Sequence, residues 1–147
     1  VIVPWSFKFL LTTEDQLKCL KQVRKHLADN GVFVLDLYPS ELTTPDRTVS
    51  YTVEVDGSTI TKTYTYSTDL FTQTRKCEAI VDVVHTNGEV EHIETNSVNA
   101  LILPREAELL VRAAGFEIVE DYGGNDFSEY SAGDWKRVLV LKKNADG

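Results

Sequence analysis

The chain has 147 residues, 42% of them hydrophobic, and a formal net charge of −8 at pH 7. A chain of this length is typical of one domain with its own core, and its acidic balance without a basic patch argues against nucleic acid as a partner. No stretch reaches the roughly 18 apolar residues of a membrane span and no signal-peptide pattern opens the chain, so we expect a cytoplasmic protein with no membrane partner.

Neither of the two cysteines, Cys19 and Cys77, has a metal-type neighbour in the sequence. We expect both to be reduced structural thiols, and we expect no metal site. The sequence also shows no Ser-His-Asp order, no CxxC pair and no phosphate-binding loop. Hydrolase and metalloenzyme functions therefore lack the residues that they need.

The N-terminal third reads as strand, helix and strand. Val1 to Val3 is short and β-branched and ends at Pro4, which predicts the end of a strand. Thr13 to Gln16 has the pattern of a capping box, in which a Thr hydroxyl accepts a backbone N–H and Gln16 reaches back to the cap. A helix is predicted over 13–29, with the left-handed stop at Asn30-Gly31. Its apolar face is Leu17, Leu20, Val23 and Leu27.

A second strand is predicted over 32–37, where five of six positions are apolar. Such a continuous run is typical of a parallel strand covered on both faces. The strand would end at Asp36-Leu37-Tyr38-Pro39, and open α/β sheets bind ligands at the carboxyl ends of their strands.

From residue 48 to 98 the pattern has period two and predicts four antiparallel strands, at about 48–56, 58–66, 71–85 and 89–98. Asp56-Gly57 and Asn87-Gly88 are strong type I′ hairpin signals. With two-residue loops, the first turn would pair Val53 with Ile60 and Val49 with Tyr64. The second would pair Val81 with Glu94 and Val83 with His92.

The C-terminal third begins with a helix at Pro104, which suits the first helical position. Its expected inner face is Ala107, Leu110, Val111 and Ala114, with Gly115 as the stop. A strand over 116–122 follows, with Ile118 and Tyr122 on one side. After the loop 123–134 comes a last strand over 138–141. No helix separates these two strands, so we expect them to pair antiparallel.

Four stretches in this order resemble the second half of a class I S-adenosylmethionine-dependent methyltransferase. They are IVPWSF, TTEDQLKCLKQVRKHLADNGVFVLDLYP, LPREAELLVRAAGFEIVEDYGG and WKRVLVLKK. The resemblance implies an α/β fold: a partial Rossmann-like methyltransferase sheet from 1–39 and 103–143, with a four-stranded antiparallel β insert at 48–98, within a single domain over 1–147. The glycine-rich cofactor loop and the first three strands of that family have no counterpart, and Gly123-Gly124 reads as a turn.

The resemblance implies S-adenosylmethionine as cofactor and a small-molecule acceptor. Without the glycine-rich loop we expect the chain alone not to bind the cofactor and to be inactive. It would then be the C-terminal part of a methyltransferase domain. Whether the chain is itself an enzyme stays open. The alternative is a non-catalytic binding or assembly module derived from a methyltransferase and acting as a homodimer.

The resemblance also suggests site residues. Pro4, Trp5 and Ser6 would lie beside the cofactor, and Phe7 and Tyr38 beside the acceptor. Their alternatives are core positions for Trp5 and Phe7 and a half-buried ring for Tyr38. His92 is the candidate catalytic base for N- or O-methylation, although a histidine without a visible carboxylate partner is more often structural.

An edge strand at Val1 to Val3 without its neighbour would leave backbone groups unpaired. We therefore expect a homodimer that buries 1–11, with Trp5, Phe7 and Phe9 as aromatic anchors.

Overall fold

The structure is a computed structural model that describes residues 2–3, 6–42 and 44–144. The chain divides into two compact units, one formed by Val1–Thr44 and Ala100–Gly147 and the other by Pro45–Asn99. Each unit has its own four-stranded sheet. The expectation of a single domain over 1–147 stays a prediction.

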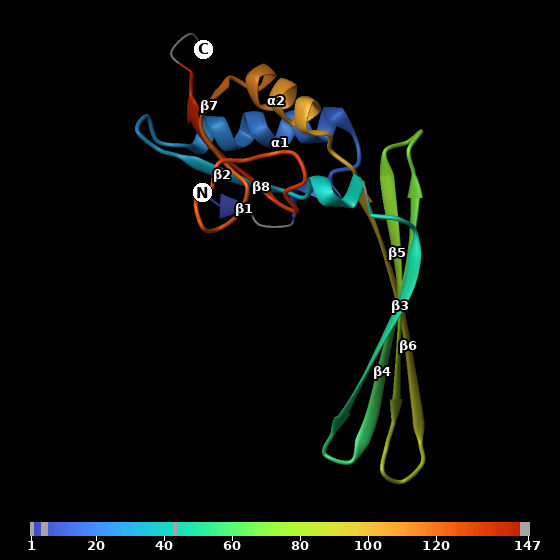
Figure 1. Cartoon of the computed structure of the whole chain (residues 1–147). Helices are drawn as coiled ribbons and strands as arrows, with labels where there is room; N and C mark the ends of the chain where they lie inside the picture. The colour runs from blue at the N-terminus through green and yellow to red at the C-terminus, as the bar shows by residue number, and fades with distance from the viewer. Residues whose placement is uncertain (1, 4–5, 43, 145–147) are drawn as a thin grey trace. The chain divides into compact units, whose positions relative to one another are not determined.

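The first unit is an α/β layer (Figure 1). Its sheet has the order β1-β2-β8-β7, with β1 parallel to β2 and β8 antiparallel to both of its neighbours. The α/β fold class and the antiparallel pairing of the last two strands are thereby confirmed. The elements are β1 (Ile2–Val3), η1 (Phe7–Phe9), α1 (Thr13–His26), β2 (Phe33–Leu37), η2 (Pro39–Leu42), α2 (Pro104–Ala113), β7 (Phe116–Tyr122) and β8 (Arg137–Lys143).

Helix α1 differs from its prediction at both ends. Its N-cap is Thr12, whose hydroxyl accepts the backbone N–H of Asp15, so the cap lies one residue earlier than expected. Gln16 is 3% exposed and donates to Leu10 O instead of completing a capping box. The helix ends at His26, and Gly31 is not among the glycines of positive φ, so the predicted left-handed stop is wrong. Leu27 is the C-cap: its backbone is extended and its side chain lies in the core.

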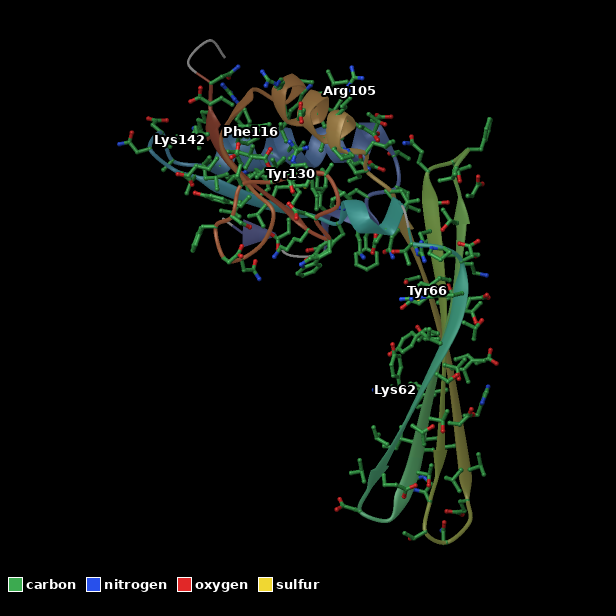
Figure 2. The ribbon with its side chains drawn as sticks, viewed as in Figure 1. Lys62, Tyr66, Arg105, Phe116, Tyr130 and Lys142 are labelled. Atoms are coloured by element: carbon green, nitrogen blue, oxygen red, sulfur yellow. The ribbon has the colours of Figure 1, made fainter. Side chains whose placement is uncertain are left out.

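Helices α1 and α2 lie side by side on one face of the sheet (Figure 1). Alternate positions of β2 are buried beneath them, whereas Val34 and Asp36, between these, have intermediate exposure and lie on the other face. Both described helices pack on the same face, and on the other face Asp36 is nearly buried by its pairing with Lys136. The expectation that both faces of this strand are covered stays a prediction. Phe116 (Figure 2) is part of the core beneath the helices. The core comprises Phe7, Leu20, Leu27, Phe33, Leu35, Leu37, Ala107, Leu110, Val111, Ala114, Phe116, Leu139 and Leu141.

The second helix matches its prediction. It begins with Pro104 at the first helical position, and Gly115 follows it with a φ of 84°. A bulge between Ile118 and Glu120 then shifts the alternation of β7. Ile118 packs against the core, while Tyr122 lies opposite Val138 on the other face. The expectation that Ile118 and Tyr122 share one side is therefore wrong, because one extra residue reverses the side-chain direction of the strand.

The second unit is an antiparallel sheet of order β3-β4-β5-β6. Its first hairpin matches the sequence prediction: Val53 pairs with Ile60 and Val49 with Tyr64. Asp56 and Gly57 have φ values of 49° and 78°, as a type I′ turn requires. The strands are β3 (Arg47–Val55), β4 (Ser58–Asp69), β5 (Thr74–Val84) and β6 (Val90–Ala100).

The second hairpin has a different turn. Gly88 has the expected positive φ of 85°, but Asn87 is not among the residues of positive φ, so the turn is not type I′. The N–H of Gly88 donates to His85 O, and the N–H of His85 donates to Glu89 O. These bonds close a loop of three residues, a type I turn followed by a left-handed glycine.

The extra loop residue changes the register of the hairpin. His92 contacts Asp82, with Nδ1 and Oδ1 2.6 Å apart, so the predicted pairings of Val83 with His92 and of Val81 with Glu94 are wrong. A shift of one residue moves every side chain of a strand to the other face.

The insert has one apolar and one polar face. On the polar face, Thr48 pairs with Thr65 and Ser50 with Thr63 through their hydroxyls, at 3.1 and 2.9 Å. The opposite face carries Lys62 and Tyr66, which are labelled in Figure 2. Its other side chains are mostly apolar: Val49, Tyr51, Val53, Ile60, Tyr64, Ala79, Val81 and Val83.

Candidate functional site at the carboxyl edge of the sheet

Strands β1, β2 and β7 end at the same edge of the first unit's sheet, where β8 begins. Near the end of β2, the carboxylate of Asp36 lies 2.9 Å from the ammonium of Lys136. The two side chains are only 9% and 7% exposed, and Lys136 also donates to Asn125 Oδ1 at 2.7 Å. Because these charges have little contact with solvent, their stability depends on the ion pair and the hydrogen bond. A buried charge without a partner is costly.

A second ion pair lies beside it. Lys8 of η1 and Glu41 of η2 are 2.8 Å apart, with side chains 15% and 26% exposed. The Lys8 ammonium also lies 5.6 Å from the centre of the Tyr38 ring, within the range of a cation–π contact. The Lys8–Glu41 ion pair thus joins the two short 3-10 helices at the carboxyl edge, and the ring of Tyr38 packs beside it.

Tyr38 follows β2 directly and packs against Trp135, with ring centres 5.9 Å apart. Burial, and then the carboxylates of Asp36 and Glu41, raise the pKa of Tyr38 to about 12. At neutral pH its phenol therefore stays protonated and can donate a hydrogen bond.

The space beside Asp36 and Tyr38 is small. A cavity of about 20 Å³ is lined by Lys8, Asp36, Leu37, Tyr38, Glu41, Ala100 and Ile102. That volume is close to the space of one water molecule and far below the roughly 300 Å³ at which small-ligand pockets begin. At the end of β2, the described part of the carboxyl edge is filled by the chain's own side chains.

The only paired glycines, Gly123 and Gly124, do not form a nucleotide cradle. A Cβ at Gly123 would collide with the carboxylate of Asp134, so the space beside this glycine is already taken. The Gly123 N–H donates to Ser128 O, which makes this segment a turn. This glycine pair therefore does not supply the cradle that S-adenosylmethionine needs, and whether the chain alone binds the cofactor stays a prediction.

The candidate cofactor residues are only partly described. Pro4 and Trp5 lie outside the described residues, as does the Trp5 anchor of the expected dimer. Ser6 is exposed and precedes η1, where its carbonyl accepts the N–H of Phe9. Its role beside the cofactor stays a prediction.

Of the two candidate acceptor residues, Tyr38 lies at the carboxyl edge, but Phe7 does not present its ring there. Phe7 is 3% exposed and belongs to the core, so its ring is covered by other core side chains. The core alternative describes its position, and the acceptor-binding role of Phe7 has no support from its environment.

His92 lies on the polar face of the insert between two carboxylates. Its Nδ1 is 2.6 Å from Asp82 and its Nε2 is 3.0 Å from Glu94. Hydrogen bonds to Glu94 and to Asp82 raise its pKa, because they favour the charged ring. A base must have a free nitrogen, so catalysis by His92 stays a prediction that requires one of these contacts to open.

Sequence reasoning did not single out Lys8, Glu41, Trp135 or Lys136. One signal was available: Asp36 is the only charged residue in an otherwise apolar strand, and such a charge needs a partner. The sequence did not say which of the many cations would supply it.

No protein-family model matches the sequence, and no curated protein matches it. Solved structures do share the fold. An S-adenosylmethionine-dependent methyltransferase from Clostridium acetobutylicum has a TM-score of 0.79 at 12% identity, covering 95% of this chain and 55% of that chain. DesVI from Streptomyces venezuelae has a TM-score of 0.74 at 21% identity, and the match covers 97% of this chain and 57% of that chain. A sugar N-methyltransferase from Streptoalloteichus has a TM-score of 0.73 at 20% identity, and the match covers 96% of this chain and 54% of that chain.

These likenesses, all below 25% identity, establish a shared fold. The chain spans about half the length of each of these structures. It is therefore similar to part of a Rossmann-like methyltransferase, with 95% or more of its own residues matched.

Proposed function

We propose that this chain is the C-terminal part of an S-adenosylmethionine-dependent methyltransferase domain that acts on a small acceptor. The observation that carries the proposal is the fold: the chain, whose first sheet has the order β1-β2-β8-β7, matches part of several methyltransferase structures over 95% or more of its own residues. An antiparallel insert between β2 and α2 belongs to the same match, because the match covers nearly the whole chain.

The acceptor we propose is a hydroxylated amine, such as an amino sugar. One matched structure is a sugar N-methyltransferase and another is an amino pentose methyltransferase. In this chain, Tyr38 would donate a hydrogen bond from its neutral phenol to the acceptor, which requires the side chains that bury its hydroxyl to move apart. Positioning of the two reactants would supply most of the acceleration, because methyl transfer needs little covalent work from the protein.

The chain alone is expected not to bind S-adenosylmethionine, because no described residues form a cradle for its adenosine. The test is calorimetry of the chain with the cofactor at millimolar concentration. We expect no saturable heat. A clear micromolar isotherm would overturn this part of the proposal.

The parent gene gives the complementary test. A glycine-rich loop encoded upstream of Val1 supports the methyltransferase proposal. The longer protein should then transfer a radiolabelled methyl group to an amino-sugar panel. A start codon at or just before Val1 supports the alternative below.

The alternative is a non-catalytic binding or assembly module that acts as a homodimer. The exposed apolar face of the insert favours it, since Tyr51 is 60% and Val53 51% exposed on a single-layer sheet. Such a sheet gains stability when its apolar face is covered.

A further inference from the structure

Phe127, in the loop between β7 and β8, is unusual in two ways. Its side chain is 74% exposed, and its backbone has a φ of 62°, in the left-handed region that bulky residues rarely adopt. Asp126 holds the turn by accepting the N–H and the hydroxyl of Ser128, at 3.2 and 2.8 Å. The loop thus holds an aromatic ring in the solvent at a conformational cost.

The ring of Phe127 meets the ring of Tyr122 at the end of β7. Their centres are 5.4 Å apart and their planes are inclined by 86°, so the two rings form a corner. Glu129 pairs with Tyr122 in an antiparallel bridge. Residues directly opposite each other in such a bridge have neighbouring side chains, so a carboxylate lies beside the aromatic corner.

A second carboxylate belongs to the same place. The hydroxyl of Tyr122 is hydrogen-bonded to Glu120, which raises the pKa of that phenol. Across the described residues, neither Glu120 nor Glu129 forms an ion pair. The corner therefore has negative charge that no side chain in the described part of the chain neutralises through an ion pair.

One cation near this corner, Arg137, is already engaged. It binds Asp121 and Glu108 at 2.6 and 2.8 Å, and its guanidinium lies 4.6 Å from the centre of the Tyr130 ring. Tyr130 is labelled in Figure 2. The Arg137 side chain is 5% exposed, so it cannot turn toward the groove. Its ion pairs with Glu108 and Asp121 join β8 to α2 and β7.

A groove of about 330 Å³ lies over these residues, lined by Glu120, Asp121, Tyr122, Phe127, Glu129 and Tyr130. We propose that it binds an organic ammonium cation, with the Tyr122–Phe127 corner contacting the alkyl groups and Glu120 and Glu129 supplying the opposite charge. Aromatic rings with nearby carboxylates are the chemistry that recognises substituted ammonium groups. A small metal ion fits less well, because two rings occupy positions where it needs oxygen ligands.

This inference does not rest on the proposed function, because the groove is complete within the described residues and needs no S-adenosylmethionine. The probe is choline, and its neutral match is 3,3-dimethyl-1-butanol, which has the same shape without the charge. Each is titrated into the isotopically labelled chain at constant ionic strength, and backbone amide shifts are followed by NMR.

Choline should give saturable shifts at residues 120–130, with a dissociation constant in the millimolar range expected for an exposed site. The neutral alcohol should bind at least about tenfold more weakly. Phe127→Ala and Glu129→Gln should each weaken choline binding by roughly three- to fivefold, as loss of an exposed cation–π or charge contact implies. Phe71→Ala is the matched control, because Phe71 is 96% exposed on the insert and should leave binding unchanged.

Equal binding of the two probes would overturn the proposal, since the groove would then be only an apolar surface. So would an absence of saturable shifts, or variants that leave the choline affinity unchanged. The amide spectra show directly whether each variant is folded. Tyr122→Leu provides a second test of the corner at a position with ordinary backbone geometry.

Discussion

At the scale of single residues, the carboxyl edge is organised by a charged pair that has little contact with solvent. Asp36 points away from the helices and is neutralised by Lys136, which comes from the start of β8. The pair thereby holds the end of the β7–β8 loop against β2. Removing one charge of the pair should therefore lower the free energy of unfolding more than removing both.

Lys136→Met should reduce the free energy of unfolding by about 3 to 5 kcal/mol, because it leaves the Asp36 carboxylate buried without a cation. The double variant Asp36→Leu/Lys136→Met should recover most of this loss. Urea unfolding measures both. Lys143→Met is the control: its partner Asp29 is fully exposed, so the loss should stay below about 1 kcal/mol. A Lys136→Met effect as small as the control's would contradict the account.

His92 provides the second residue-scale test. Its pKa is raised by hydrogen bonds to Glu94 and Asp82, so NMR titration should place it above the usual 6.5. Because the folded-state pKa is the higher one, the ion pairs stabilise the fold fully below the unfolded pKa and lose this effect as pH rises through the folded value. Glu94→Gln and Asp82→Asn should each lower the pKa. An unchanged value in both variants would show that the carboxylates do not hold the ring.

At the scale of elements, the two hairpins of the insert show how loop length decides register. Asp56-Gly57 forms the two-residue turn and keeps the predicted pairs. Asn87-Gly88 looks equivalent in sequence but belongs to a three-residue loop, which brings Asp82 to His92. The candidate base thus acquires its carboxylate contact from the loop.

Gly57 and Gly88 both have positive φ, so Gly88→Val and Gly57→Val should each destabilise by roughly 1 kcal/mol or more. Gly88 gives the cleaner measurement, because nothing lies within 4 Å of an added Cβ, whereas at Gly57 the Cβ would also meet Thr86 at 2.9 Å. Gly88→Asn is the matched control, since Asn tolerates the left-handed region. Thermal unfolding decides; unchanged midpoints in both Val variants would contradict the turn assignments.

At the scale of the whole molecule, the first unit leaves part of its sheet without cover. Both helices pack on one face, and β1 is an edge strand whose pairing among the described residues is with β2. Phe9 and Leu11, which follow β1, are 55% and 45% exposed. Phe7 lies in the core, so it does not serve as the dimer anchor that its sequence position suggested.

We predict a homodimer that buries the N-terminal segment through Phe9 and Leu11, because exposed edges and apolar groups favour association. Sedimentation equilibrium at micromolar concentration should give a mass above the 16.5 kDa of one chain. Phe9→Ser/Leu11→Ser should shift the protein toward monomer, while Phe71→Ser, at an even more exposed aromatic in the second unit, should not. A clean, cooperatively folded monomer at this concentration would contradict the prediction.

Sequence alone determined the features that depend on neighbours along the chain. Apolar periodicity identified the inner faces of both helices, Pro104 and Gly115 marked the bounds of α2, and the two-residue turn at Asp56-Gly57 determined the first hairpin's register. Each of these depends on local geometry, in which a few residues decide the backbone.

Tertiary structure decided what depends on residues far apart. Lys136 as the partner of Asp36, Gln16 in the core and the aromatic corner of Tyr122 and Phe127 follow from how strands and loops meet. A bulge or one extra loop residue reverses a strand's faces. Local sequence patterns do not reveal a bulge or an extra loop residue, yet the contacts of the candidate site depend on such changes.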